Sequence, residues 1–166
     1  MSKKAAPGGT PATVALTRAK IAFTLHPYEH HADAGSYGEE AAAALGVDPR
    51  QIFKTLIAEA TTKHGTELVV GVVPVAAHLD LKALAASLGA KKAAMADPAA
   101  AARSSGYVLG GISPLGQRTR LRTVLDASAL AHPTIMVSAG KRGLQVELAP
   151  ADLVSVTSAL VSPISA

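Results

Sequence analysis

Lys54 is the most informative charged residue, because it lies inside a short apolar run. Residues 52–57 read IFKTLI, and β-strand alternation places Lys54 between Ile52 and Leu56 on one face. An ammonium group there has two interpretations. Its aliphatic stem extends to the solvent at a sheet edge, or the cation is held on a rigid strand at the floor of a pocket. In the second case it faces a phosphate, a carbonyl or a carboxylate.

A glycine-rich segment is the second candidate. Residues 106–116 read GYVLGGISPLG, an ordered but irregular loop. Gly110 and Gly111 favour either a tight turn at a strand end or backbone N–H groups that approach a ligand oxygen closely, because no Cβ obstructs them. Together with Lys54, and without a strong nucleophile, they describe a site that polarises and positions an anionic or carbonyl-containing substrate.

Other catalytic motifs are incomplete. Residues 26–31, HPYEHH, contain types that a metal site uses, but Pro27 blocks the helix that would align the histidines, so an exposed polar loop is the expectation. Ser113 lies in G-x-S-x-x-G, where Pro114 lacks the N–H that a nucleophile elbow needs. No cysteine is present, and no phosphate-binding or dinucleotide motif opens a helix. We expect neither a metal nor a cofactor.

A local excess of basic residues lies between residues 117 and 142. Five of them, opposed only by Asp126, form a stretch suited to phosphates: Arg118, Arg120, Arg122, Lys141 and Arg142. A solvated basic face is the alternative interpretation. The total charge of +4 is less informative, since two of the lysines stand in the first four residues. With two Phe and three Tyr, the chain has too few aromatic residues for an extended base-stacking platform.

These residues must be positioned by one domain, because 166 residues of which 49% are hydrophobic suit a single core. Capping signals and apolar periodicity predict helices over 10–19, 36–45, 80–88 and 97–105, and a last one from 150. Alternating or β-branched runs predict strands over 21–26, 52–60, 68–73, 107–109, 122–125, 134–138 and 144–148. Six or seven strands with four or five helices indicate a mixed α/β or α+β fold.

The two ends of the expected domain are residues 10 and 166, and residues 1–9 are predicted to be a disordered tail. No apolar stretch is long enough to span a bilayer, and the N-terminus lacks the apolar core of a signal peptide. We therefore expect a soluble, cytoplasmic protein without membrane partners.

At these residues the sequence resembles the YbaK family of bacterial aminoacyl-tRNA editing deacylases, which share a fold with the editing insertion of bacterial prolyl-tRNA synthetase. The resemblance covers residues 11–160 and is carried by segments 28–30, 52–56, 79–82, 89–92, 95–98, 106–116 and 140–144. It implies a mostly antiparallel mixed sheet or a partly open barrel. The implied activity is removal of cysteine from Cys-tRNA(Pro), with Cys-tRNA(Cys) as a second candidate.

The resemblance also implies roles for individual residues. Lys54 is the residue most needed for activity and anchors the terminal nucleotide or the aminoacyl group, the Gly110 N–H holds the carbonyl oxygen, and Tyr28 shapes the pocket. Substrate contacts are expected from Thr55, Gly111, Ile112, Ser113, Ser138 and Gln145. Family members often have aspartate where Gln145 stands, so a charge-dependent role there stays open. The five basic residues would meet the acceptor-stem backbone of the tRNA.

The implied mechanism suits a chain without a strong nucleophile. The substrate's own thiol attacks its ester carbonyl and releases tRNA and a cyclic thiolactone, so the enzyme need only orient the substrate. Prolyl-tRNA synthetase is the expected partner for tRNA identity, and no DNA binding is expected. Two alternatives remain: a deacylase of another mischarged tRNA, such as Ala-tRNA, that uses water, and a non-catalytic adaptor that binds a nucleotide or a tRNA end.

Overall fold

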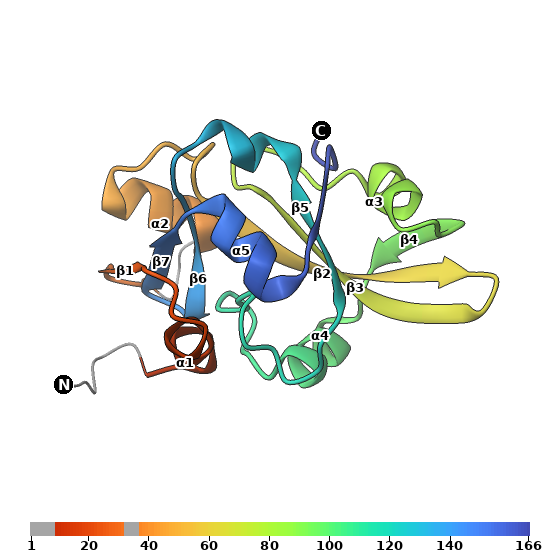
Figure 1. The fold of residues 1–166 in the computed structure, drawn as a ribbon, viewed down its shortest axis with the longest axis horizontal. Coiled ribbons are helices and arrows are strands. Elements are labelled where there is room, and N and C mark those ends of the chain that lie inside the picture. Colours follow the sequence, from red (N-terminus) through yellow and green to blue (C-terminus); the bar gives the residue numbers. More distant parts are fainter. Residues whose placement is uncertain (1–8, 32–36) are drawn as a thin grey trace.

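Eight strands form two sheets in a computed structural model that describes residues 9–31 and 37–166 (Figure 1). The three-stranded sheet has the order β1-β7-β6, and all its pairs are antiparallel. Its strands are β1 (Thr24–Pro27), β6 (Ile135–Lys141) and β7 (Leu144–Leu148). Figure 1 shows this sheet at one end of the molecule, while the hairpin of β2 and β3 extends at the other.

The five-stranded sheet has the order β4-β2-β3-β5-β8. Its strands are β2 (Phe53–Thr62), β3 (Gly65–Pro74), β4 (Lys92–Met95), β5 (Arg122–Asp126) and β8 (Leu160–Ser162). The β2–β3 and β2–β4 pairs are antiparallel, whereas β3–β5 and β5–β8 are parallel. The expected mixed, mostly antiparallel architecture is therefore confirmed.

The five predicted α-helices are present, and the 3₁₀ helix η1 was not predicted. They are α1 (Pro11–Arg18), α2 (Tyr37–Leu45), α3 (Leu81–Ser87), α4 (Pro98–Ser105), α5 (Pro150–Thr157) and the 3₁₀ helix η1 (Ala127–Ala131). The side chains of Thr10, Asp80 and Asp97 accept hydrogen bonds from backbone N–H groups in the first turns of α1, α3 and α4. The predicted cap of α2 falls on Ser36, which lies outside the described residues, as do residues 1–8 of the predicted tail.

Two strand predictions need correction, and two strands were missed. Residues 107–109 are not a strand, because Tyr107 turns into the core and its hydroxyl donates to the Leu115 carbonyl at 2.5 Å. The first strand starts only at Thr24, since β7 pairs with residues from there onward. β4 and β8 were not predicted. Lysine and alanine in β4 have low strand propensity, and β8 has three residues, so pairing with β2 and β5 decides their conformation.

The main core lies where α1 and α5 pack with strands of both sheets. Its fully buried side chains include Leu16, Phe53, Leu125, Val146 and Leu153. The Thr10 hydroxyl also donates to the Ala139 carbonyl at 2.5 Å and ties the start of α1 to β6. These contacts give the strands a rigid frame. No helix in the described part of the chain is both long and apolar enough to cross a membrane.

The two sheets meet at the start of β2. Ile52 forms a parallel bridge with Met136 of β6, whose N–H donates to the Gln51 carbonyl at 3.1 Å. On the other side, the Val75 N–H donates to the Ile52 carbonyl at 2.8 Å. Lys54 follows two residues after this junction, so the fold places it where both sheets can supply walls to a pocket.

Candidate active site

A cavity of about 400 Å³ lies at the junction of the two sheets, large enough for a small ligand or the end of a larger one. Its walls come from α2, β2, β4, α4, the glycine-rich segment, β6 and β7. The polar lining residues are Tyr37, Lys54, Thr55, Ser138 and Gln145, and the others are Gly38, Ile52, Phe53, Leu56, Ile57, Met95, Ala96, Pro98, Ala101, Leu109, Gly110 and Ile112.

Lys54 is the cation of this cavity. It pairs with Val73 in the β2–β3 ladder, so β3 fixes its backbone on one side, whereas β4 pairs with β2 only further along, at residues 58–61. Burial lowers the pKa of the Lys54 ammonium from its ordinary value of 10.5, and the negative charge of Glu39 on α2 opposes this effect. The structure thus supports the pocket interpretation: a partly desolvated cation on a rigid strand, suited to an anionic or carbonyl group.

Two buried polar atoms in the cavity wall have no protein partner among the described residues. They are Thr55 Oγ1 and Gln145 Oε1, and the Gln145 residue is only 6% exposed. An unpaired buried polar group costs about 1–3 kcal/mol, and such groups are expected to have a partner. A ligand could supply it, because Gln145 Oε1 accepts a hydrogen bond and the Thr55 hydroxyl either donates or accepts one.

Gly110 sits in the cavity wall in a conformation that favours glycine. Its φ is +83°, and a Cβ would lie 2.6 Å from two ring atoms of Tyr37. The loop is closed by the Gly111 N–H, which donates to the Val108 carbonyl at 3.0 Å. No residue that the structure describes accepts a hydrogen bond from the Gly110 N–H, which leaves this amide for a ligand.

Six of the nine predicted catalytic and substrate-binding residues line the cavity: Lys54, Thr55, Gly110, Ile112, Ser138 and Gln145. Tyr28, Gly111 and Ser113 are not among the lining residues. Tyr28 packs against a buried cluster that includes Ile52 and Met136, and its N–H donates to the Gly143 carbonyl at 2.9 Å. The buried Ser113 hydroxyl accepts from the Leu115 N–H at 3.2 Å.

Gly111 lies behind the cavity wall, against the β6–β7 hairpin. A Cβ on this residue would lie 2.9 Å from the Cα of Lys141, so the close approach requires glycine. This contact brings the glycine-rich segment and the hairpin together, although Gly111 itself does not face the cavity.

The sequence interpretation missed Tyr37, Met95 and Leu109. Tyr37 stands at the first turn of α2, and Met95 and Leu109 are half-exposed apolar residues at the cavity. Leu109 lies in the glycine-rich segment and Met95 in segment 95–98, but neither they nor Tyr37 were given a role, because only tertiary contacts bring their side chains to the cavity. Their positions become apparent only when α2, β4 and the glycine-rich segment are packed together.

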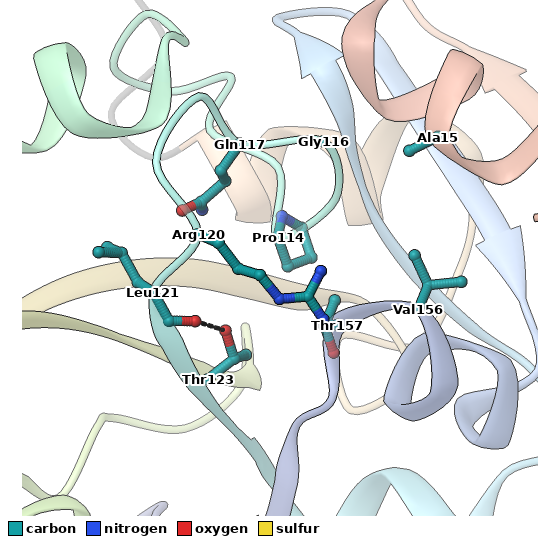
Figure 2. Close-up of a pocket in the computed structure, with 9 residues that line it drawn as sticks. All are labelled: Ala15, Pro114, Gly116, Gln117, Arg120, Leu121, Thr123, Val156 and Thr157. Carbon is teal, nitrogen blue, oxygen red and sulfur yellow. Dashed lines mark hydrogen bonds between the residues drawn. The ribbon is translucent and has the colours of Figure 1, made fainter. Parts of the chain in front are cut away.

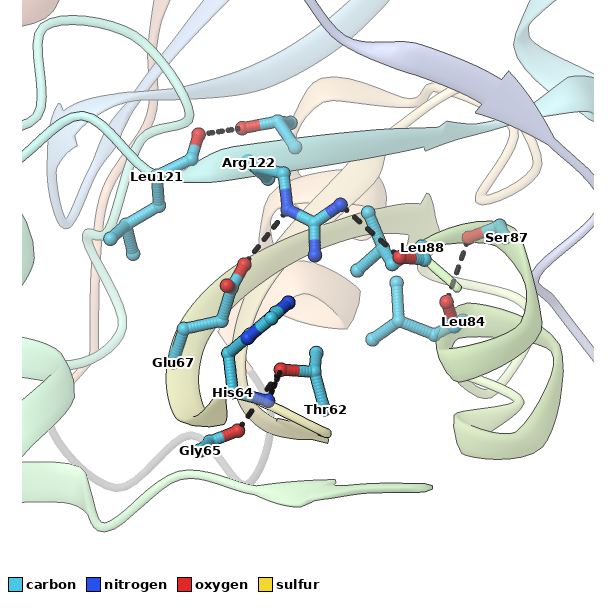
Figure 3. Close-up of polar contacts among 10 residues, drawn as sticks. Thr62, His64, Gly65, Glu67, Leu84, Ser87, Leu88, Leu121 and Arg122 are labelled. Carbon is cyan, nitrogen blue, oxygen red and sulfur yellow. Dashed lines mark hydrogen bonds and ion pairs between the residues drawn. The ribbon is translucent and has the colours of Figure 1, made fainter. Parts of the chain in front are cut away.

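The predicted basic residues contact different parts of the molecule. Figure 3 shows Arg122 between β3 and the end of α3: its Nε pairs with Glu67 Oε1 at 2.8 Å, and its Nη1 donates to the Leu88 carbonyl at 3.2 Å. Arg118 packs against Gly106. The guanidinium of Arg122 is therefore engaged within the protein, and the five basic side chains do not share one set of contacts.

Arg120 lines a second, smaller cavity of about 160 Å³ (Figure 2). Its Nη2 donates to the Ser158 hydroxyl at 2.9 Å, and Figure 2 shows the side chain extending toward Thr157. Pro114 and Gly116 also line this cavity, so the C-terminal end of the glycine-rich segment borders the smaller cavity and its middle borders the larger one. The smaller cavity contains none of the predicted catalytic residues.

The histidines predicted to form a polar loop each contact a different carboxylate. The pairs are His26–Glu147 and His30–Glu40, both at 2.7 Å, and His31–Glu29 at 3.3 Å. Within residues 9–31 and 37–166, no group of three or more histidine or acidic side chains is arranged to hold a metal ion.

The fold and the site together define a class of protein: a two-sheet α/β domain with a lysine, a glycine-rich loop and unpaired polar atoms around one cavity. A family model described as "Aminoacyl-tRNA editing domain" matches residues 31–156, more than half of the chain. The chain belongs to this family. The resemblance seen in the sequence and the expected class of enzyme, an aminoacyl-tRNA deacylase, are both confirmed.

Individual relatives agree with the family. A curated protein of Enterococcus faecalis, named "Putative Cys-tRNA(Pro)/Cys-tRNA(Cys) deacylase EbsC", is 37% identical over 158 residues, which cover 95% of this chain and 94% of that protein. A crystal structure of "a putative trans-editing enzyme for prolyl tRNA synthetase" has a TM-score of 0.80 at 25% identity and covers 97% of this chain and 98% of its own. The hypothetical protein APE2540, at 23% identity with a TM-score of 0.82 over 95% of this chain and 100% of its own, shares the fold.

Proposed function

We propose that this chain is a trans-editing deacylase that removes cysteine from Cys-tRNA(Pro). One observation carries the proposal. Lys54, Gly110, and Thr55 and Gln145 with their unpaired polar atoms line one cavity whose described lining residues include no histidine, cysteine, aspartate or glutamate. Such a cavity can bind and orient an aminoacyl ester, and its described lining holds no histidine or carboxylate to activate water.

The proposed chemistry follows from this composition. The thiol of the cysteinyl group attacks its own ester carbonyl, a C–S bond forms, and the C–O bond to the terminal ribose breaks. The thiol proton ends on the departing ribose hydroxyl, so the products are tRNA with a free 3′ end and a cyclic thiolactone. Because nucleophile and electrophile belong to one molecule, orientation supplies much of the rate enhancement.

Each polar residue then has a role set by its chemistry. The Gly110 N–H donates to the ester carbonyl oxygen, where negative charge develops as sulfur attacks. Lys54 anchors the acyl group or the terminal nucleotide and stabilises the same charge. Gln145 Oε1 accepts a hydrogen bond from the α-ammonium group, which gives this buried atom the partner that it lacks in the protein.

Prolyl-tRNA synthetase is the proposed partner, and the cytoplasm is the proposed site of action. The basic side chains contact separate parts of the protein, with Arg122 already paired to Glu67. This distribution favours limited contact with the tRNA backbone and a partner that supplies tRNA identity. The name of the structural neighbour for prolyl-tRNA synthetase supports the same assignment.

The decisive experiment measures deacylation of Cys-tRNA(Pro), Ala-tRNA(Pro) and Pro-tRNA(Pro) by the wild type, Lys54→Ala and the control Lys63→Ala at the tip of the β2–β3 hairpin. We expect loss of the cysteinyl ester alone, as thiolactone. Lys54→Ala should reduce kcat/KM by about 100-fold or more, the range for loss of an electrostatic stabiliser, while Lys63→Ala remains active.

Other outcomes would redirect the assignment. If the product is free amino acid that carries solvent oxygen, the mechanism is attack by water and not cyclisation. If Ala-tRNA(Pro) is deacylated, the assignment of cysteine as the amino acid removed is wrong. Tight binding of aminoacyl-tRNA without turnover would identify an adaptor. Wild-type rates in Lys54→Ala would refute the role of Lys54.

A further inference from the structure

Buried Tyr107 and Leu115 anchor the two ends of the loop that carries Gly110, but the two side chains directly before Gly110 are not buried. Val108 is 58% exposed and Leu109 is 44% exposed, although both are large and apolar. Stabilisation of a loop by burial needs side chains that are removed from water. The position of the Gly110 amide must therefore depend on contacts from neighbouring elements.

Two side chains make these contacts. The Tyr37 ring lies directly against Gly110, where it occupies the space that a Cβ would need. The guanidinium carbon of Arg142 lies 4.7 Å from the centroid of the same ring, and the Nε of Arg142 donates to the Leu109 carbonyl at 2.8 Å. One arginine thus binds both the loop and the ring that covers it. We call this pair the Tyr37–Arg142 clasp.

The tyrosine side of the clasp is anchored to the end of β1. The His30 ring lies 5.5 Å from the Tyr37 ring, and its Nδ1 is 2.7 Å from Glu40 Oε1 on α2. The second carboxylate oxygen of Glu40 accepts the His31 N–H at 2.7 Å. The hydrogen bonds from His30 and His31 hold the pKa of Glu40 below its ordinary value. The first turn of α2 is therefore tied down where Tyr37 begins it.

The arginine side is anchored in the β6–β7 hairpin. Lys141 pairs with Leu144, so Arg142 and Gly143 form a two-residue turn, and Gly143 has a φ of +86°. Gly111 packs against the backbone of this turn. Three segments far apart in sequence, around residues 37, 110 and 142, are thus joined at one wall of the cavity.

We propose that Tyr37 and Arg142 are positioning residues for deacylation and hold the Gly110 amide in place relative to Lys54. This inference rests on the proposed function, in which that amide donates to the ester carbonyl. A donor acts on a developing oxyanion only within about 2.7–3.1 Å, and a displacement of about 1 Å costs up to 100-fold in rate. In this proposal the exposed side chain of Arg142 supports deacylation by holding the loop. From the sequence, a contact with the tRNA backbone was expected for it.

The test compares Tyr37→Leu, Tyr37→Phe and Arg142→Lys with the wild type, and uses Arg18→Lys on α1 as the matched control. Tyr37→Leu removes the ring but keeps an apolar side chain, and we expect kcat to fall about 10- to 100-fold with KM changed less than threefold. Tyr37→Phe keeps the ring and should rescue kcat. Arg142→Lys keeps the charge but loses the planar stacking and the Nε donor, and kcat should fall about tenfold.

Hydrogen–deuterium exchange of residues 108–111 supplies a readout that does not depend on activity. Exchange should become faster in Tyr37→Leu and Arg142→Lys, and should stay at the wild-type rate in Tyr37→Phe and Arg18→Lys. A rise in KM alone for Arg142→Lys would assign the arginine to tRNA binding and overturn the clasp. Unchanged exchange and unchanged kcat in Tyr37→Leu would overturn it as well.

Failure of the proposed function gives a different pattern. A wild type without deacylase activity, or activity independent of Lys54, refutes the function whatever Tyr37 does. In that case the exchange rates alone decide whether the clasp holds the loop. Lys54-dependent activity with wild-type kcat in both clasp variants refutes the inference and leaves the proposed function standing.

Discussion

Gly110→Ala is the substitution whose consequences the structure defines best. Two separate penalties apply to it. The residue has a φ of +83°, where an alanine costs about 1–2 kcal/mol, and the new methyl group would overlap the Tyr37 ring at 2.6 Å, an overpacking of about 1–3 kcal/mol. The expected total is about 2–5 kcal/mol if the loop stays in place.

Gly46→Ala provides the matched control. Gly46 has a φ of +65°, and nothing lies within 4 Å of the position of a Cβ, so only the backbone penalty of about 1–2 kcal/mol applies. For a chain of this size, 1 kcal/mol shifts Tm by about 2–4 °C. Gly46→Ala should therefore lower Tm by about 2–8 °C, and Gly110→Ala by about 4–20 °C.

Thermal unfolding and single-turnover deacylation together test this reasoning. If the loop moves to relieve the overlap, Tm falls less but kcat falls, because the amide is displaced. In a Tyr37→Ala background the overlap is absent, and Gly110→Ala should then cost as much as Gly46→Ala. Equal Tm shifts for Gly110→Ala and Gly46→Ala, with wild-type kcat, would show that the ring does not confine Gly110.

Two further predictions concern ionisable groups. Asp126 is only 2% exposed, and this burial raises the pKa of its carboxyl group. Hydrogen bonds from Ser128, Ile164 and Ser165 have the larger combined effect, so the pKa is lowered overall. The stabilisation is thus present above the ordinary pKa of 3.8 and is lost as the pH falls through the lower folded value. Asp126→Asn should cost about 2–3 kcal/mol in urea unfolding at pH 7 and weaken the acid dependence; wild-type stability would contradict this. For Lys54, the lowered pKa predicts that kcat/KM falls with a midpoint below 10.5, and that this alkaline limb is absent in Lys54→Arg; an identical limb in both proteins would exclude Lys54 as its source.

Local signals predicted most of the fold. The caps at Thr10, Asp80 and Asp97 and the β-branched runs of β2 and β3 act within a few residues, so the sequence displays them directly. β4 and β8 have no such signal, because pairing with a distant strand makes them extended. At residues 107–109 the aromatic and apolar side chains predicted a strand that the structure does not have, because Tyr107 is buried in the core.

For the candidate site, too, residues with a local sequence signal could be predicted and residues placed by tertiary contacts could not. Lys54 could be recognised because a charge in an apolar strand is unusual, and Gly110 because paired glycines interrupt a loop. Tyr37 could not be recognised, because its ring contacts Gly110 and the guanidinium of Arg142, and both residues are more than 70 positions away in the chain. Arg142 was recognised as a cation, but its contact with the Leu109 carbonyl is a property of the packed hairpin.

The pairing of β1 with β7 also determines when the three-stranded sheet can form during synthesis of the chain. His26 and Glu147 are 121 residues apart. At about 5–20 residues per second, a ribosome needs roughly 6 to 24 s to synthesise the chain from one to the other. Throughout that interval β1 has no partner strand, and the pocket lacks the walls that Ser138 and Gln145 provide. Lys54 and Gly110 both precede β6 and β7 in the chain, yet a nascent chain that stops before β7 has no finished site, so the site is complete only when the last quarter of the polypeptide has emerged.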